Sequence, residues 1–255
     1  MHFQTDVIIG KTISIDELKA EGFQGIFVGS GAGLPNFMDI PGENALNIMS
    51  SNEYLTRVNL MDAANPSADT PINLGKKVLV VGGGNTAMDS CRTAKRLGAD
   101  VTLVYRRSEA EMPARIEEVK HAKEEGIKFL TLHNPKEYLT DENGAVKAAV
   151  LDVMQLGEPD QSGRRRPETT GETITIECDQ VIVAVGVSPN PLVPKSIEGL
   201  TLGRKNTIAV NDQMQSSRKE IYAGGDIVRG GATVILAMGD GRRAAMNMSK
   251  QLTEA

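Results

Sequence analysis

The stretch from Val78 to Ser108 contains the pattern that most restricts the fold of this chain. It reads VLVVGGGNTAMDSCRTAKRLGADVTLVYRRS: an apolar run, three glycines, a segment with helical spacing of apolar residues, and a second apolar run. An apolar run that enters a glycine turn and continues as a helix is typical of a buried parallel strand and its crossover. The sequence therefore predicts an α/β fold built on a parallel sheet.

The glycine spacing in this stretch is that of a dinucleotide-binding turn. Gly82 permits the tight turn, Gly84 lets a pyrophosphate approach the helix N-terminus, and Ala87 is small enough for helix-to-strand packing. Asn85 and Thr86 add polar groups and free amides in the first helical turn, where the helix dipole favours an anion. The alternative is a glycine turn without a ligand. The correct order of strand, motif, helix and second strand favours the nucleotide site.

The end of the second strand indicates which nucleotide binds. Arg106 and Arg107 stand where an acid would hydrogen-bond the ribose of NAD, about 20 residues after the motif. The planar guanidinium pairs well with phosphate, and Ser108 offers one more donor. The pair could instead be simply solvated. The spacing favours NADP(H) and its 2′-phosphate.

Other segments extend the α/β pattern. Apolar runs at 25–31 and 179–187 also lead into glycine, where ligands meet parallel strands. Apolar spacing predicts helices at 85–97, 111–125 and 231–252, and a meander of strands between 127 and 178.

The C-terminal segment AGGDIVRGGATVILAMGDGRRAA suggests a second ligand site. Asp226 follows two glycines at the end of a short apolar run, and a helix begins near Thr233. Such an aspartate can accept from a ribityl hydroxyl, while the helix N-terminus can face the electron-rich edge of a flavin.

One family resemblance is carried by four segments of the chain: GGGNTAMD, VTLVYRRSEAEMPA, FVGSGAG and the C-terminal segment. The resemblance is to the NADPH- and FAD-binding small (beta) subunit of glutamate synthase and its relatives, which are pyridine nucleotide-disulfide oxidoreductase-like. It implies a Rossmann-like NADPH-binding domain, with a parallel sheet plus a β-meander, inserted in an incomplete FAD-binding Rossmann-like domain. On this reading residues 1–70 and 191–255 are FAD-binding segments and residues 71–190 are the NADPH-binding domain.

The same resemblance implies hydride transfer between NADPH and FAD, with the protein positioning both cofactors. It implies a partner: the glutamate synthase large subunit or another electron-accepting subunit. The flavoprotein subunit of a ferredoxin:NADP oxidoreductase complex is an alternative identity for the chain itself. No catalytic acid or base and no metal ligand is predicted. The implied cofactor-binding residues are, for NADP(H), Gly82, Gly84, Asn85, Thr86, Ala87, Arg106, Arg107, Ser108, Val185 and Gly186, and for FAD, Gly29, Ser30, Gly31, Gly225, Asp226 and Thr233.

The sequence also departs from the family pattern. No G-x-G-x-x-G motif precedes residue 25, and the cysteine-rich region for iron–sulfur clusters is missing. We therefore expect the chain to begin partway through the FAD domain, to bind flavin weakly and to be impaired as an enzyme. A catalytically silent NADP(H)-binding module is the alternative.

Composition narrows the remaining classes. The net charge of -5 argues against nucleic-acid binding and against an acidic membrane surface. No signal peptide or membrane-spanning run is present, so a cytoplasmic location is expected. Cys91 and Cys178 form no C-x-x-C pair, which disfavours a disulfide reductase, and we expect both to be inert and buried.

Overall fold

The computed structural model describes residues 2–65, 67–159, 163 and 165–254. It contains two compact units, which are treated separately below. Pro35–Gly186 form the inserted unit, and Met1–Leu34 with Val187–Ala255 form the split unit. The two-residue strands β2 (Leu34–Pro35) and β11 (Val187–Ser188) pair with each other at the unit boundaries.

The inserted unit is built on a five-stranded sheet in the order β3-β10-β4-β5-β6, and every neighbouring pair is parallel. The predicted parallel sheet is confirmed. The strand bounds are β3 (Ile48–Ser50), β4 (Lys77–Val81), β5 (Asp100–Tyr105), β6 (Lys128–Thr131) and β10 (Gln180–Val183).

Both faces of this sheet are buried, which explains the uninterrupted apolar runs. Val78 and Val80 of β4 belong to a core that includes helix residues, while Leu79 and Val81 belong to a second core beneath an antiparallel sheet. Successive side chains of a strand point to opposite faces, so one strand serves both cores.

The antiparallel sheet has the order β7-β8-β9, formed by β7 (His133–Thr140), β8 (Val146–Pro159) and β9 (Arg165–Glu177). The predicted meander is thus confirmed from residue 133 onward. The run at 127–132, which the sequence analysis placed in the meander, instead forms β6 of the parallel sheet. It follows helix α4 (Ile116–Glu124) and pairs with β5, as a crossover strand does.

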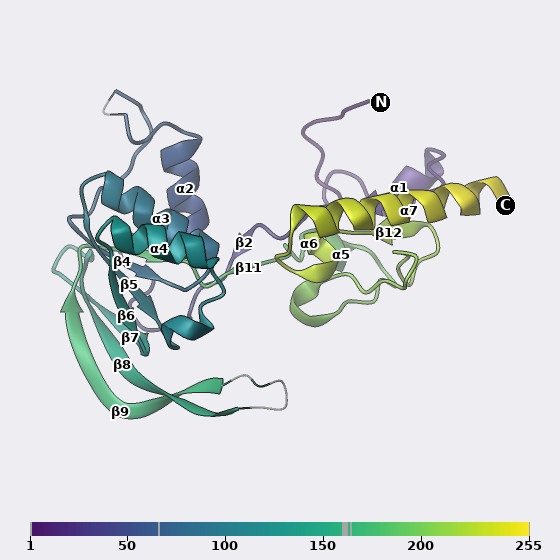
Figure 1. The fold of residues 1–255 in the computed structure, drawn as a ribbon. Helices are drawn as coiled ribbons and strands as arrows, with labels where there is room; N and C mark the ends of the chain where they lie inside the picture. Colours follow the sequence, from purple (N-terminus) through teal and green to yellow (C-terminus); the bar gives the residue numbers. More distant parts are fainter. Residues whose placement is uncertain (1, 66, 160–162, 164, 255) are drawn as a thin grey trace. The chain divides into compact units, whose positions relative to one another are not determined.

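Three helices cover the other face of the parallel sheet (Figure 1). They are α2 (Ser51–Asn59), α3 (Asn85–Arg96) and α4 (Ile116–Glu124). The helix predicted at 111–125 is shorter than expected and follows a 3₁₀ turn at Glu109–Glu111. Met112 is extended, with φ -64° and ψ 127°, because the residue before a proline avoids helical geometry.

The inserted unit also begins earlier than the predicted residue 71. Strand β3 pairs with β10, and Tyr54 and Val58 of α2 are buried in the core shared with β4. These contacts place residues 35–70 in the inserted unit and not with the N-terminal segment. The unit ends at Gly186, before the predicted residue 190. The nucleotides assigned to the two units remain predictions.

The split unit has a two-stranded parallel sheet of β1 (Ile26–Val28) and β12 (Ile221–Ala223). Its core includes Val28, Ile221 and Ile227. Its helices are α1 (Ile15–Ala20), α5 (Leu192–Ser196), α6 (Asp226–Arg229) and α7 (Val234–Glu254), with a 3₁₀ turn at Arg204–Asn206.

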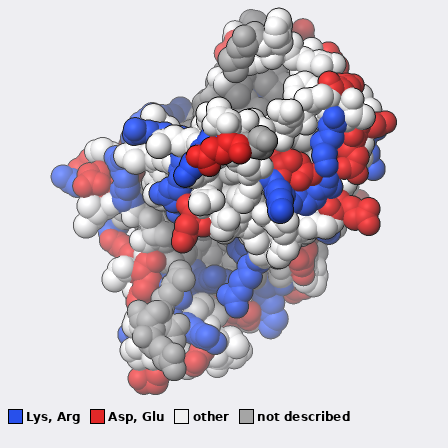
Figure 2. Space-filling model, turned by 90° about the vertical axis from the view of Figure 1, so that its right-hand side faces the viewer, with Lys and Arg blue, Asp and Glu red and all other residues white. Residues whose placement is uncertain are grey.

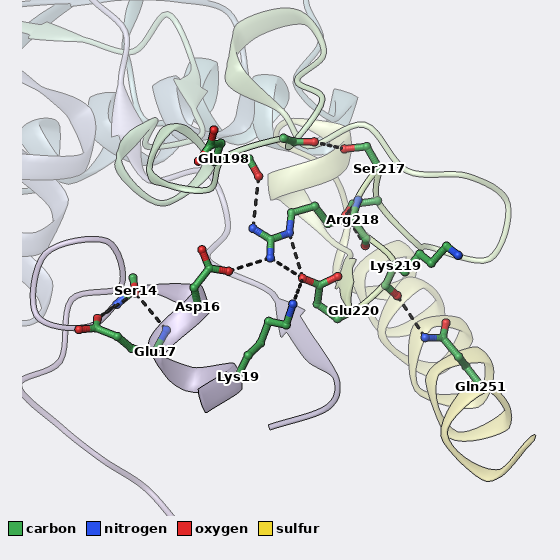
Figure 3. Close-up of polar contacts among 12 residues, drawn as sticks. Ser14, Asp16, Glu17, Lys19, Glu198, Ser217, Arg218, Lys219, Glu220 and Gln251 are labelled. Atoms are coloured by element: carbon green, nitrogen blue, oxygen red, sulfur yellow. Dashed lines mark hydrogen bonds and ion pairs between the residues drawn. The ribbon is translucent and has the colours of Figure 1, made fainter. Parts of the chain in front are cut away.

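An ion-pair network ties the N-terminal and C-terminal segments of the split unit together (Figure 3). The Arg218 guanidinium bonds to Glu220 and to Asp16 of α1, at 2.9 Å for Asp16, and Lys19 of α1 lies 3.2 Å from Glu220. Burial alone would raise the pKa of Glu220. Hydrogen bonds from the backbone, Arg218 and Lys19 outweigh burial and lower this pKa to about 2.

No described helix is long and apolar enough to cross a membrane. Figure 2 shows Lys and Arg side chains interspersed with Asp and Glu side chains on the face it presents. Within the described ranges, no three His, Cys, Asp or Glu side chains are arranged to hold a metal ion.

We predict that Glu220 makes the stability of the split unit pH-dependent. A carboxyl whose pKa is lowered in the folded state stabilises the fold fully at pH values above its ordinary pKa of 4.5. This stabilisation is lost as the pH falls toward the lowered pKa of about 2. The substitution Glu220→Gln should cost about 2 kcal/mol at pH 7 and flatten the acid dependence below pH 4.5. Thermal unfolding of both proteins across this pH range checks the prediction; parallel acid profiles would contradict it.

Candidate functional site

The three glycines after β4 meet different surroundings. Gly82 has φ 145°, and a Cβ there would lie 2.3 Å from the carbonyl oxygen of Ala184. A Cβ on Gly83 would lie 2.6 Å from the Tyr105 ring. A Cβ on Gly84 would meet nothing within 4 Å. Gly82 and Gly83 are thus required by packing, while Gly84 leaves the open surface that a ligand needs.

Helix α3 begins with geometry suited to an anion. Gly84 is its N-cap, extended at φ -92° and ψ 176°, and the first turn carries no acidic residue. The first backbone amide of the helix that donates to the Gly84 carbonyl is the amide of Ala87. The Ala87 side chain is fully buried. Within the described part of the chain, the amides of Asn85 and Thr86 have no acceptor, so both can donate to a ligand.

The two arginines after β5 do not share one environment. Arg106 is exposed, whereas Arg107 is 8% exposed, and its Nε has no hydrogen-bond partner within the described residues. The Arg107 carbonyl accepts from the amide of Leu132, a residue held in the left-handed region at φ 56°. Arg106 is therefore the arginine available to a ligand in solution.

Ser108 is already committed within the chain. Its amide and its hydroxyl both donate to the Glu111 carboxylate, in a capping box. The predicted role of Ser108 as a phosphate donor would require its hydroxyl to leave Glu111.

The second predicted NADP segment lies beside the glycine turn. The Ala184 amide donates to the Val81 carbonyl at 2.7 Å, which continues the β4–β10 ladder to the carboxyl edge of the sheet. Val185 and Gly186 follow directly, with Val185 exposed and Gly186 at φ 99°. The predicted NADP residues follow β4, β5 and β10, so they gather at the carboxyl ends of these parallel strands.

The predicted FAD residues gather in the split unit in the same way. Gly29, Ser30 and Gly31 follow β1, and Gly225 and Asp226 follow its parallel neighbour β12.

The chain after β12 is fixed by local bonds. Gly225 has φ 77° and ψ -150°, a conformation open essentially to glycine alone. One carboxylate oxygen of Asp226 accepts from the Ala232 amide at 3.1 Å, and the Thr233 hydroxyl accepts from Leu236. Among the described residues, the other Asp226 oxygen accepts no hydrogen bond.

Sequence reasoning missed the ion pair that supports this turn. Asp240 of α7 is 1% exposed, and both of its oxygens pair with the Arg229 guanidinium at 2.6 Å. It also accepts from the Gly225 amide at 3.1 Å. Hydrogen bonds from Arg229 lower the pKa of Asp240. The available signal was an aspartate between two glycines inside a mostly apolar helix.

The two cysteines are buried, as predicted. Cys91 and Cys178 are both free and buried, and burial raises the pKa of each thiol to about 12. A raised pKa keeps a thiol protonated near neutral pH, which disfavours nucleophilic reactivity.

We predict that Asp240→Asn loosens the turn at Gly225. The bidentate pair with Arg229 loses its charge, at a cost of about 2 kcal/mol of unfolding free energy. Urea unfolding measures the cost, and hydrogen exchange at the Gly225 amide should become faster. Asp212→Asn is the matched control, because Asp212 is an exposed aspartate of the same unit. Equal effects of the two substitutions would contradict the supporting role.

Comparison with known proteins gives a consistent picture. The family model described as "Pyridine nucleotide-disulphide oxidoreductase" matches residues 4–241. NADPH-Fe(3+) oxidoreductase subunit beta of Geobacter sulfurreducens is 36% identical over 98% of this chain and 40% of its own length. Glutamate synthase (NADPH) small chain of Halomonas elongata is 34% identical over 96% of this chain and 53% of its own length.

Solved structures share the fold. The Mycobacterium tuberculosis FprA structure in complex with NADPH superposes with a TM-score of 0.80 at 20% identity, over 98% of this chain and 68% of its own. Thioredoxin reductase of T. acidophilum gives a TM-score of 0.66 at 20% identity, over 90% of this chain and 66% of its own. The chain spans about 40% of the length of the Geobacter relative.

Proposed function

We propose, because this chain belongs to the pyridine nucleotide-disulphide oxidoreductase family, that its inserted unit binds NADPH and its split unit contributes to an FAD site. The observation that carries the proposal is the glycine turn between β4 and α3. Its open surface at Gly84 and the two available amides after it fit a pyrophosphate.

Arg106 supports NADPH over NADH. It is exposed at the carboxyl end of β5, next to the strand that carries the glycine turn. A guanidinium there would pair with the 2′-phosphate of NADPH. NADH lacks this phosphate and offers no such partner. The Geobacter and Halomonas relatives are also named as NADPH enzymes.

The residues of the split unit fit the proposed flavin site. A free oxygen of Asp226 can accept from a hydroxyl, and the 21-residue helix α7 begins directly after this turn. The bound nicotinamide and flavin would supply the hydride chemistry, while the chain binds and orients them.

We further propose that the electrons leave to a partner subunit. The relatives carry names of different enzymes, an iron(III) oxidoreductase and a glutamate synthase, although they are similarly distant from this chain. The acceptor is therefore a glutamate synthase large subunit or another electron-accepting subunit.

A second candidate function is an NADP(H)-binding module without flavin chemistry. It is favoured by the small sheet of the split unit, which has two described strands, β1 and β12. An FAD-binding Rossmann sheet normally offers more strands to hold the cofactor.

We predict that Arg106→Ala with Arg107→Ala weakens NADPH binding at least about tenfold more than NADH binding, because only NADPH carries the 2′-phosphate. Arg106→Ala alone should produce most of this loss, because Arg106 is the exposed arginine. Isothermal titration with both nucleotides measures the difference. Equal losses for NADPH and NADH would sink the 2′-phosphate assignment.

Flavin separates the two candidate functions. If the oxidoreductase proposal holds, the purified chain reconstituted with FAD should show a flavin absorption band that NADPH bleaches under anaerobic conditions. A chain that binds NADPH but leaves added FAD free would support the nucleotide-binding module. Equilibrium dialysis of FAD provides the binding measurement independently of reduction.

A further inference from the structure

The segment from Ser108 to Arg115 is folded against the glycine turn. The Ala114 amide donates to the Gly83 carbonyl at 3.0 Å, and the Arg115 amide donates to Oδ1 of Asn85 at 2.9 Å. The Tyr105 hydroxyl donates to the Glu111 carbonyl at 2.9 Å. These bonds hold the start of α4 beside the start of α3.

Arg115 is therefore placed next to the two open amides. It is the N-cap of α4, extended at φ -63° and ψ 141°, and its backbone is bonded to the first residue of α3. This contact uses only the amide of Arg115, so it does not tie down the side chain.

Among the described residues, the Arg115 guanidinium has one weak partner. Its Nη2 lies 3.8 Å from Glu118, and 68% of its side chain is exposed. The other carboxylate oxygen of Glu118 is bonded to Arg92 at 2.6 Å. Glu117 also stands in the first turn of α4, but no described ion pair joins it to Arg115. An ion pair at this distance and exposure contributes little, so an anion can displace it.

We propose that Arg115 contacts the pyrophosphate of the bound dinucleotide. The proposal rests on the proposed function and deepens it, because it assigns one arginine to the 2′-phosphate and another to the pyrophosphate. Arg106 stands at the end of β5 and serves the 2′-phosphate. Arg115 is bonded to the first residue of α3, whose amide faces the pyrophosphate, and a charge-assisted pair forms there with either nucleotide.

The test compares nucleotides as well as variants. Arg115→Ala should weaken binding of NADPH and of NADH by a similar factor, about tenfold. Arg106→Ala should weaken binding of NADPH alone. Lys120→Ala is the matched control and should change neither affinity. Lys120 is an exposed cation of the same helix, and it pairs with Glu124 at 3.7 Å.

Titration of the 255-residue chain and of each variant with NADPH and with NADH gives the affinities to compare. Unchanged affinities in Arg115→Ala would overturn the proposal, and so would a loss confined to NADPH. Failure of the unsubstituted chain to bind either nucleotide would instead refute the proposed function. The thermal midpoint of Arg115→Ala should match that of the unsubstituted chain, since the bond to Asn85 uses the backbone.

Discussion

The close approach of β4 to the end of β10 fixes the geometry of the candidate nucleotide site. Gly82 lies so near the Ala184 carbonyl that no side chain fits between them. This contact joins two segments about 100 residues apart, and it depends on two buried cores that hold the sheet from either face. A larger residue at 82 would separate the strand ends and disturb the turn as well as the Val185–Gly186 segment.

The same contact explains why much of the inserted unit could be predicted from sequence. Burial on both faces makes the strands apolar throughout, and the glycines mark where they end. The strand at 77–81 and the helix from Asn85 therefore follow from the local pattern. The start of α4 did not follow from the local pattern. The apolar spacing predicted a helix from residue 111, but the extended geometry required before Pro113 delays its start.

Features that depend on distant partners could not be predicted from local pattern. The assignment of residues 35–70 to the inserted unit depends on the pairing of β3 with β10. No residue spacing within 35–70 predicts this contact. The Arg229–Asp240 pair joins α6 to α7 and supports the conformation of Gly225. Asp240 is an acid, and a helical pattern alone would place it on the surface. Buried ion pairs of this kind stand out in sequence only as exceptions to an apolar run.

The arginine pair shows how two identical neighbours can meet different surroundings. Arg106 and Arg107 lie in a bend directly after β5, so strand alternation does not fix which way their side chains point. In this chain Arg106 takes the exposed side and Arg107 the buried side. Leaving a buried donor such as Arg107 Nε unpaired costs about 1–3 kcal/mol. The strained backbone of Leu132, bonded to the Arg107 carbonyl, adds to this cost. Two unfavourable features side by side at the sheet edge are typical of a functional site, where binding outweighs local stability.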